Sequence, residues 1–145
     1  MNNLAIVLLA AGNSSRLGQP KQLLPFIDGS LLRWQCLQAL SVSKKVICVI
    51  GYEAKQMASK IDDLTVQLVV NQQWQQGLSR SIAQGISALD EEVEGALLLL
   101  IDQWQITAGD LRLLISCWQN KSQDIVAASS GYGADKKTGP PVIFG

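Results

Sequence analysis

An unbroken apolar run near the start of the chain, residues 4–9 with the sequence LAIVLL, most constrains the fold. A strand with one face in water alternates apolar and polar residues, whereas a run that is apolar throughout fits a strand buried on both faces. Parallel sheets that are covered by helices contain such strands. We therefore expect an α/β fold in which the loop after this run leaves the carboxyl end of a sheet strand.

That loop, residues 10–21, combines small residues and glycines with two cationic side chains. Gly12 has no Cβ to block a close approach, Gly18 can adopt dihedral angles that other residues avoid, and Arg16 and Lys21 add positive charge. The loop lacks the G-x-x-x-x-G-K-[ST] spacing, because five residues separate the two glycines, and it also lacks G-x-G-x-x-G. It is therefore predicted to bind an anion such as a phosphate without belonging to either motif.

The rest of the chain alternates short apolar runs with helical patterns, and it contains no repeat or low-complexity linker. Five strand and helix alternations predict a doubly wound, mostly parallel sheet with helices on both faces and right-handed crossovers. At 145 residues the chain is expected to form one domain, residues 1–145. The further runs are residues 44–51, 65–71, 95–102, 124–128 and 142–144, the last after a glycine-rich loop.

Local signals mark three of the helices. Ser30 can cap a helix over the following residues, and Thr107 with Asp110 forms the spacing of a capping box. A third helix carries Gly85 on its apolar side, where it could approach the sheet closely. The apolar stripe of that helix is expected to comprise Leu78, Ile82, Ile86 and Leu89.

Composition excludes several kinds of chemistry. The chain has no histidine, so Ser-His-Asp and Cys-His catalysis and histidine-based zinc sites are excluded. Twelve basic and twelve acidic side chains balance, which gives no indication of a nucleic-acid surface, and no apolar run reaches the length of a membrane span. The three cysteines, without C-x-x-C spacing, indicate core packing in a reduced cytoplasmic compartment.

Asp102 ends the most apolar run, residues 95–102. If that strand lies beside residues 4–9 where the strand order reverses, the Gly12 loop and Asp102 flank the usual ligand crevice of such sheets. Asp102 would then hold a divalent cation against bound phosphates, or alternatively would only cap the next turn. Phosphoryl and nucleotidyl transfer need little more than such positioning and charge neutralisation.

Several long motifs resemble those of the MobA-like nucleotidyltransferases. The first stretch, LLAAGNSSRLGQPKQLLP, is similar to the family signature L-A-A-G-x-S-x-R-M-G-x-x-K-x-L-L-P, with Leu17 in place of methionine. Later stretches resemble the family in the same order: NQQWQQGLSRSIAQGI, LLLLIDQ and AASSGYGADKKTGPPVIFG. The Ala-Ala-Gly and Asp-Gln forms are similar to the molybdenum cofactor cytidylyltransferase branch.

The resemblance implies a fold of the nucleotide-diphospho-sugar-transferase type and transfer of CMP from CTP to the phosphate of molybdopterin, with Mg²⁺ as cofactor and pyrophosphate as product. The attacking group is already an anionic phosphate, so no general base is required. The implied site comprises Leu9, Ala10, Ala11, Gly12, Asn71, Gly77 and Ser81 at the nucleotide, Arg16 and Lys21 at the triphosphate, Asp102 at the metal, and Gly139 and Pro140 at the acceptor. Ser81 could instead cap its helix, and Trp74 is expected to pack rather than to stack on a base.

Two departures from the family pattern keep alternatives open. Trp104 replaces the proline after Asp-Gln, and the sequence ends at Gly145, where relatives continue, so we expect a fold truncated at its C-terminus. One alternative is a nucleotidyltransferase that uses GTP or a sugar-phosphate acceptor. The other is a domain that binds a nucleotide or a molybdoenzyme partner without turnover.

Overall fold

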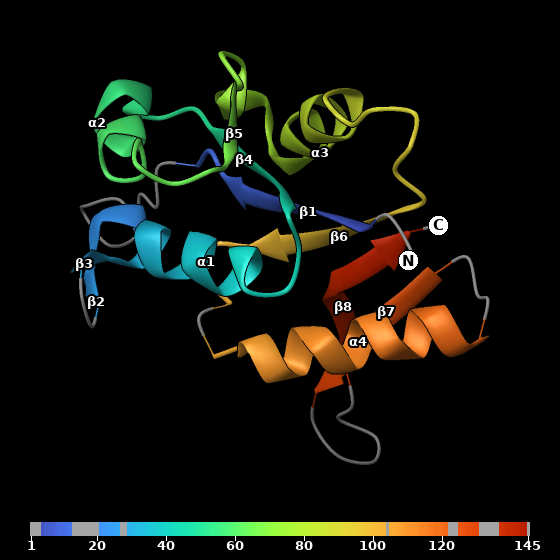
Figure 1. Cartoon of the computed structure of the whole chain (residues 1–145). Coiled ribbons are helices and arrows are strands. Elements are labelled where there is room, and N and C mark those ends of the chain that lie inside the picture. Colours follow the sequence, from blue (N-terminus) through green and yellow to red (C-terminus); the bar gives the residue numbers. More distant parts are fainter. Residues whose placement is uncertain are drawn as a thin grey trace.

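Figure 1 shows the chain as a computed structural model, which describes residues 4–12, 21–26, 29–103, 105–121, 125–130 and 137–144. For residues 21, 26, 120, 121, 125–130, 137–142 and 144 the description covers the backbone only. The helices and strands are β1 (Leu4–Ala10), η2 (Lys21–Leu23), β2 (Pro25–Phe26), β3 (Gly29–Ser30), α1 (Leu31–Leu40), β4 (Lys45–Ile50), α2 (Ala54–Ser59), β5 (Gln67–Val70), η3 (Trp74–Gln76), α3 (Leu78–Ser87), β6 (Gly95–Leu100), α4 (Ala108–Lys121), β7 (Ile125–Ser130) and β8 (Lys137–Phe144).

Six strands form one sheet in the order β5-β4-β1-β6-β8-β7, and β2 and β3 form a separate antiparallel pair. Strand β1 pairs in parallel with β4 on one side and with β6 on the other. The chain thus builds outward from β1 to β4 and β5, and then returns to place β6 on the opposite side of β1. The strand order therefore reverses between β1 and β6, where open α/β sheets bind their ligands.

Both faces of β1 are covered by helices, which explains why every residue of the strand is apolar. Ile6 and Leu8 pack on one face, in the cluster that includes side chains of α1, α2 and α4. Val7 and Leu9 point to the other face and pack in the cluster that α3 covers. Figure 1 shows α3 on one side of the sheet and α1 and α4 on the other. The α/β sandwich expected from the sequence is confirmed.

Two predicted helix caps are present. The Arg33 backbone N–H donates to Ser30 Oγ at 3.2 Å, at the start of α1. Before α4 the capping box is reciprocal: Thr107 N donates to Asp110 Oδ2 at 3.0 Å, and Asp110 N donates to Thr107 Oγ1 at 3.1 Å. These bonds satisfy backbone donors that a helix start otherwise leaves without partners.

The predicted apolar stripe of α3 is only partly right. Leu78 and Ile86 lie on the exposed side, at 49% and 39% exposure, while Ser81 and Gly85 are buried against the sheet. A Cβ added to Gly85 would lie 2.6 Å from Val7 Cγ1, so the helix approaches β1 too closely for larger side chains. Small residues face the strand because backbone proximity, and not hydrophobicity alone, decides which side of this helix is buried.

Two cysteines pack in the core, as expected. Cys36 and Cys48 are buried, and hydrogen bonding with the Cys36 thiol, together with burial, raises the pKa of the Cys48 thiol well above its ordinary value. Cys117 is half-buried, and all three are free thiols. Within the described residues no helix combines the length and apolarity that crossing a membrane would require.

The last strand is longer than predicted. The sequence indicated a glycine-rich loop and then residues 142–144, but β8 begins at Lys137 and runs antiparallel between β6 and β7. Its register with β7 shifts so that Ala127 pairs with Val142 but Ala128 pairs with Gly139, which leaves Pro140 and Pro141 between the two pairs. Proline has no N–H to donate, and bulges are where a strand accepts it. The prolines therefore fall where the ladder already breaks.

Candidate functional site

The two predicted anchoring segments leave neighbouring strands at the point where the strand order reverses. Leu9 pairs with Leu100 at the ends of β1 and β6, and the Ile101 N–H donates to the Leu9 carbonyl at 3.2 Å. The backbone of residues 10–12 and the turn that carries Asp102 therefore begin side by side at one sheet edge. Asp102 itself is exposed on that turn.

A buried glutamine holds the segment after β1 in place. Gln22 is only 1% exposed, and its Nε2 donates to the Ala10 carbonyl at 2.6 Å and to the Gly12 carbonyl at 2.9 Å. Because a trans peptide is planar, fixing the Ala10 carbonyl also fixes the direction of the Ala11 N–H. The other amide atom, Gln22 Oε1, is buried and has no hydrogen-bond partner within the described part of the chain.

Gly12 leaves space around its backbone. A Cβ built on this residue would meet no heavy atom of the described residues within 4 Å. A ligand can therefore approach the Gly12 backbone without displacing a protein side chain. Lys21 opens η2 directly before Gln22, but its side chain, like Arg16 and Gly18, lies outside what the structure describes.

Two further glutamines shape the turn that carries Asp102. Gln103 folds back on the end of β6, where its Oε1 accepts from Leu100 N at 3.0 Å and its own N–H donates to the Leu100 carbonyl at 3.1 Å. Gln35 of α1, which is fully buried, donates from Nε2 to the Ile101 carbonyl at 3.2 Å. The carbonyl of the peptide that precedes Asp102 is thus held by Gln35, and the residues on either side of that peptide are tied to the end of β6 by Gln103. The cap of α4 is made by its own Thr107, so Asp102 is not required for it.

Asn71 ties the third loop of this edge to α3. Its backbone N–H donates to the Ile50 carbonyl at 2.7 Å, and its side chain is completely buried. Nδ2 donates to Ser81 Oγ at 2.9 Å, while Oδ1 accepts from Gln73 N at 2.9 Å and from Gln84 Nε2 at 3.1 Å. The Asn71 amide therefore sets the shape of the loop and the position of α3. Ser81 accepts this bond and forms no side-chain cap of its helix.

Aromatic packing joins the same loop to the segment after β1. Tyr52 N donates to the Ala11 carbonyl at 3.0 Å, and the Tyr52 ring meets Trp74 edge-on with centroids 5.4 Å apart. A Cβ on Gly51 would lie 2.7 Å from the Trp74 Cβ, so the two segments touch closely. Gly77 follows with φ of 104°, which favours glycine, and it begins α3 without a side-chain cap. The packing expected of Trp74 is thus present.

Gly139 and Pro140, which were predicted to line the acceptor side, lie on β8 at the same edge of the sheet. Val142 pairs with Leu98, and because β8 is antiparallel, Pro140 and Gly139 lie toward the carboxyl end of β6, past that pair. Within the described backbone, these residues, residues 9–12, 71–81 and Asp102 all lie at the carboxyl ends of the parallel strands.

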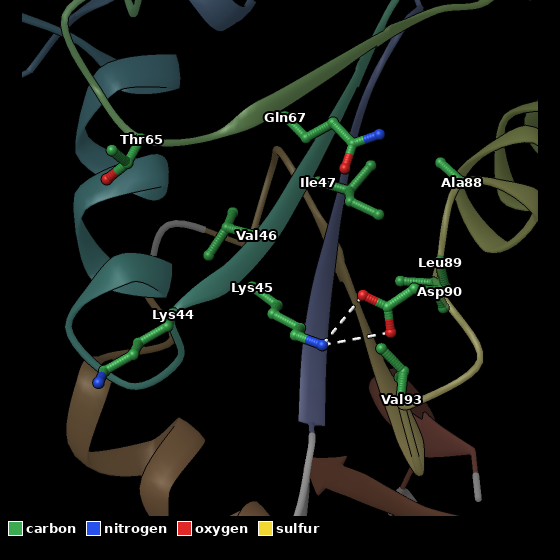
Figure 2. A pocket seen from close by; sticks show the side chains of 10 residues that line it. All are labelled: Lys44, Lys45, Val46, Ile47, Thr65, Gln67, Ala88, Leu89, Asp90 and Val93. Carbon is green, nitrogen blue, oxygen red and sulfur yellow. Dashed lines mark hydrogen bonds and ion pairs between the residues drawn. The ribbon is translucent and has the colours of Figure 1, made fainter.

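A cavity of about 250 Å³ lies elsewhere, at the amino ends of β4 and β5, and Figure 2 shows its lining. Lys45 Nζ and Asp90 Oδ2 meet across it at 3.1 Å, and the hydrogen bond from Lys45 lowers the pKa of Asp90. Ile47 and Val93 add apolar surface. This cavity is on the opposite edge from Asp102, so the predicted site does not include it.

Asp102 is suited to share a divalent ion with a phosphate ligand. No group of three or more acidic or cysteine side chains that could hold a metal occurs in the part of the chain described. Mg²⁺ commonly binds through one or two carboxylates and completes its shell with substrate phosphates and water. A single exposed carboxylate beside a segment with an open glycine backbone fits that donor pattern.

The residues that sequence analysis missed are the buried glutamines. Gln35 falls at helical spacing among Leu31, Leu32, Cys36 and Ala39, so a polar residue within an apolar face was the available signal. For Gln22 no such periodic signal existed, because the carbonyls that it binds belong to a different element.

The fold and this edge define a domain of the nucleotidyltransferase type. Residues 6–145 match the family described as MobA-like NTP transferase domain, and the chain belongs to that family. The molybdenum cofactor cytidylyltransferase of Escherichia coli is 29% identical over 93 residues, which cover 63% of this chain and 48% of that protein. The chain thus spans about half the length of that relative.

Solved structures share the whole described architecture. Rv0371c from Mycobacterium tuberculosis superimposes with a TM-score of 0.81 at 28% identity, covering 99% of this chain and 71% of that chain. A second structure of Rv0371c, in complex with manganese, matches with a TM-score of 0.76 at 25% identity over the same shares. That relative therefore binds manganese on the same fold.

Proposed function

We propose that this chain transfers CMP from CTP to the terminal phosphate of a molybdopterin acceptor and releases pyrophosphate, with Mg²⁺ as the metal. Family membership and the similarity to the Escherichia coli cytidylyltransferase support the nucleotidyltransferase chemistry. The observation that carries the proposal is the pairing of β1 with β6, which sets the Gly12 segment beside the Asp102 turn.

The reaction joins two anions, so the main task of the protein is to neutralise charge and fix orientation. An oxygen of the acceptor phosphate attacks the α-phosphorus of CTP. The bond from that phosphorus to the oxygen that bridges the α- and β-phosphates then breaks, and pyrophosphate leaves with the electron pair. No proton has to be removed from the attacking oxygen, which agrees with a sequence that has no histidine.

We assign roles to the residues at this edge as follows. Bound Mg²⁺, held by Asp102, would withdraw charge from the phosphates, while Lys21 and Arg16 would hold the triphosphate and the leaving pyrophosphate. The backbone of residues 9–12 would contact the nucleotide, and Gly139 and Pro140 would line the acceptor side. Asn71, Gly77 and Ser81 would border the base and ribose, with Asn71 and Ser81 acting through the loop that they hold.

Isothermal titration with CTP and with GTP, in EDTA and in Mg²⁺, tests the nucleotide, and pyrophosphate release with molybdopterin tests the transfer. We expect CTP to bind more tightly than GTP and pyrophosphate to appear only when Mg²⁺ and the acceptor are both present. Tighter binding of GTP would favour the alternative nucleotide. CTP binding without turnover would favour a nucleotide-binding or molybdoenzyme-partner domain.

The variant Asp102→Asn isolates the metal role. Because Asp102 is exposed, we expect an unchanged thermal unfolding midpoint together with loss of Mg²⁺-dependent pyrophosphate release. Turnover that stays at the wild-type level in this variant would reject the assignment.

The proposal extends to organisation and location. Residues 1–145 are taken as one nucleotidyltransferase domain, and the three free thiols favour a reducing compartment such as the cytoplasm. A molybdoenzyme that receives the finished cofactor is the expected protein partner.

A further inference from the structure

Two fully buried glutamines on different elements each bind backbone carbonyls at the carboxyl ends of β1 and β6. Gln22 holds the carbonyls of Ala10 and Gly12, and Gln35 holds the carbonyl of Ile101, one residue before Asp102. Both side chains are at most 1% exposed, and in both the Oε1 atom has no hydrogen-bond partner within the described residues.

A buried amide oxygen that accepts no hydrogen bond, as in these two glutamines among the described residues, is costly for folding because its desolvation is not repaid. The surroundings of Gln35 are apolar, with Leu32, Cys36 and Ala39 buried on the same helix. A methionine of similar volume would fill this space without a vacant acceptor. Packing therefore does not explain why an amide stands here, whereas its bond to Ile101 does.

The bonds act on different loops. Gln22 fixes the peptide planes of the segment whose N–H groups are proposed to face phosphate. Gln35 fixes the peptide plane from which Asp102 projects, and Ile101 is bonded on its other side to Leu9. Each glutamine thus orients one of the two parts that the proposed function requires.

We propose that Gln22 is a positioning residue for the nucleotide phosphates and Gln35 a positioning residue for the metal-bearing Asp102. This inference rests on the proposed function. It predicts a separation of effects that a shared structural role would not produce, since one loop serves the nucleotide and the other the metal.

The test measures CTP affinity by isothermal titration, first in EDTA and then in Mn²⁺, for the wild-type protein, Gln22→Met and Gln35→Met. The ratio of the two affinities reports the coupling between metal and nucleotide without requiring turnover. Gln38→Met is the matched control, because Gln38 lies on the same helix as Gln35 but its Oε1 accepts from Ala108 N at the start of α4.

We expect Gln22→Met to weaken CTP binding in EDTA by about tenfold or more while the metal ratio is kept, because a backbone N–H that is no longer oriented would lose one hydrogen bond to a charged phosphate. Gln35→Met should leave binding in EDTA unchanged and reduce the metal ratio by about tenfold, as expected when the orienting partner of a metal ligand is removed. Gln38→Met should change neither quantity.

The inference would be overturned if both variants lost CTP affinity in EDTA and the metal ratio to a similar extent, because the glutamines would then only maintain the fold. An unchanged metal ratio in Gln35→Met would also overturn its role. If either methionine variant lacks a cooperative unfolding transition, Gln22→Leu and Gln35→Leu are measured in the same way. Wild-type protein that binds neither CTP nor GTP would instead contradict the proposed function itself.

Discussion

The variant Gly85→Ala tests whether α3 packs against β1 too closely for any residue larger than glycine. In an ordinary helix interior, alanine is more favourable than glycine by about 1 kcal/mol. Here the new Cβ would lie 2.6 Å from Val7 Cγ1 and 3.1 Å from Val49 Cγ2. Because carbon atoms do not approach so closely, the Val7 side chain must leave its position, or α3 and β1 must move apart; the first is costly because a valine side chain is stiff and this one is buried.

The strand has little freedom to move. Val7 is completely buried, and β1 is paired with β4 on one side and β6 on the other. Overpacking in such a core typically costs about 1–3 kcal/mol, and the helix gain of about 1 kcal/mol from alanine offsets part of that cost. We expect a net loss of about 1 kcal/mol in the free energy of unfolding, which lowers the thermal midpoint by about 3 °C for a chain of this size.

Gly109→Ala is the matched control, since Gly109 lies exposed in the first turn of α4 and, among the described residues, its added Cβ would meet only Thr107 Oγ1, at 3.5 Å. This variant should stabilise the protein by a few tenths to about 1 kcal/mol. Urea unfolding followed by circular dichroism measures both effects. A stabilising or neutral Gly85→Ala would refute the argument from close contact.

The contact can also be measured as a coupling. Val7→Ala alone should destabilise the protein by creating a cavity, but combined with Gly85→Ala it makes room for the new methyl group. The double variant should be more stable than the sum of the single effects predicts, by about 0.5–3 kcal/mol. Strict additivity would show that Gly85 and Val7 do not constrain each other.

Three other variants test individual residues. Gly12→Ala should leave the thermal midpoint unchanged, because the described structure is open around this residue, but it should weaken CTP binding about tenfold because the new methyl group blocks the close approach of the nucleotide. An affinity for CTP equal to that of the wild type would exclude backbone contact at Gly12. Thr107→Ala removes one half of the capping box and should lower the free energy of unfolding, measured by urea titration, by about 1 kcal/mol. An unchanged urea midpoint would mean that Asp110 alone suffices to cap α4. The hydrogen bond from Lys45 lowers the pKa of Asp90, so the pair stabilises the folded state above the ordinary pKa of a carboxyl group, and this contribution is lost as the pH falls through the lowered pKa. Asp90→Asn should therefore make the free energy of unfolding less dependent on acidic pH, and a pH profile identical to that of the wild type would count against the pair.

Local features of the fold could be read from the sequence because their causes are local. The uninterrupted apolar run of β1 reflects helices on both faces, and the capping box at Thr107 involves residues only three positions apart. Periodicity was less reliable for α3, where Leu78 and Ile86 lie outside and Ser81 and Gly85 face the sheet. In that helix the distance to the strand, and not the hydrophobic pattern, decides what is buried.

For the site, the residue types in the sequence identify which groups could act: a glycine-bearing loop with two cationic side chains, a carboxylate after the most apolar strand, and no histidine. The tertiary structure decided how they are held. Gln22 and Gln35 bind carbonyls 10 and 66 residues away in sequence, and β8 enters the sheet antiparallel between β6 and β7. Such pairings depend on which segments the sheet brings together, and no local pattern specifies the backbone carbonyl that a distant amide will meet.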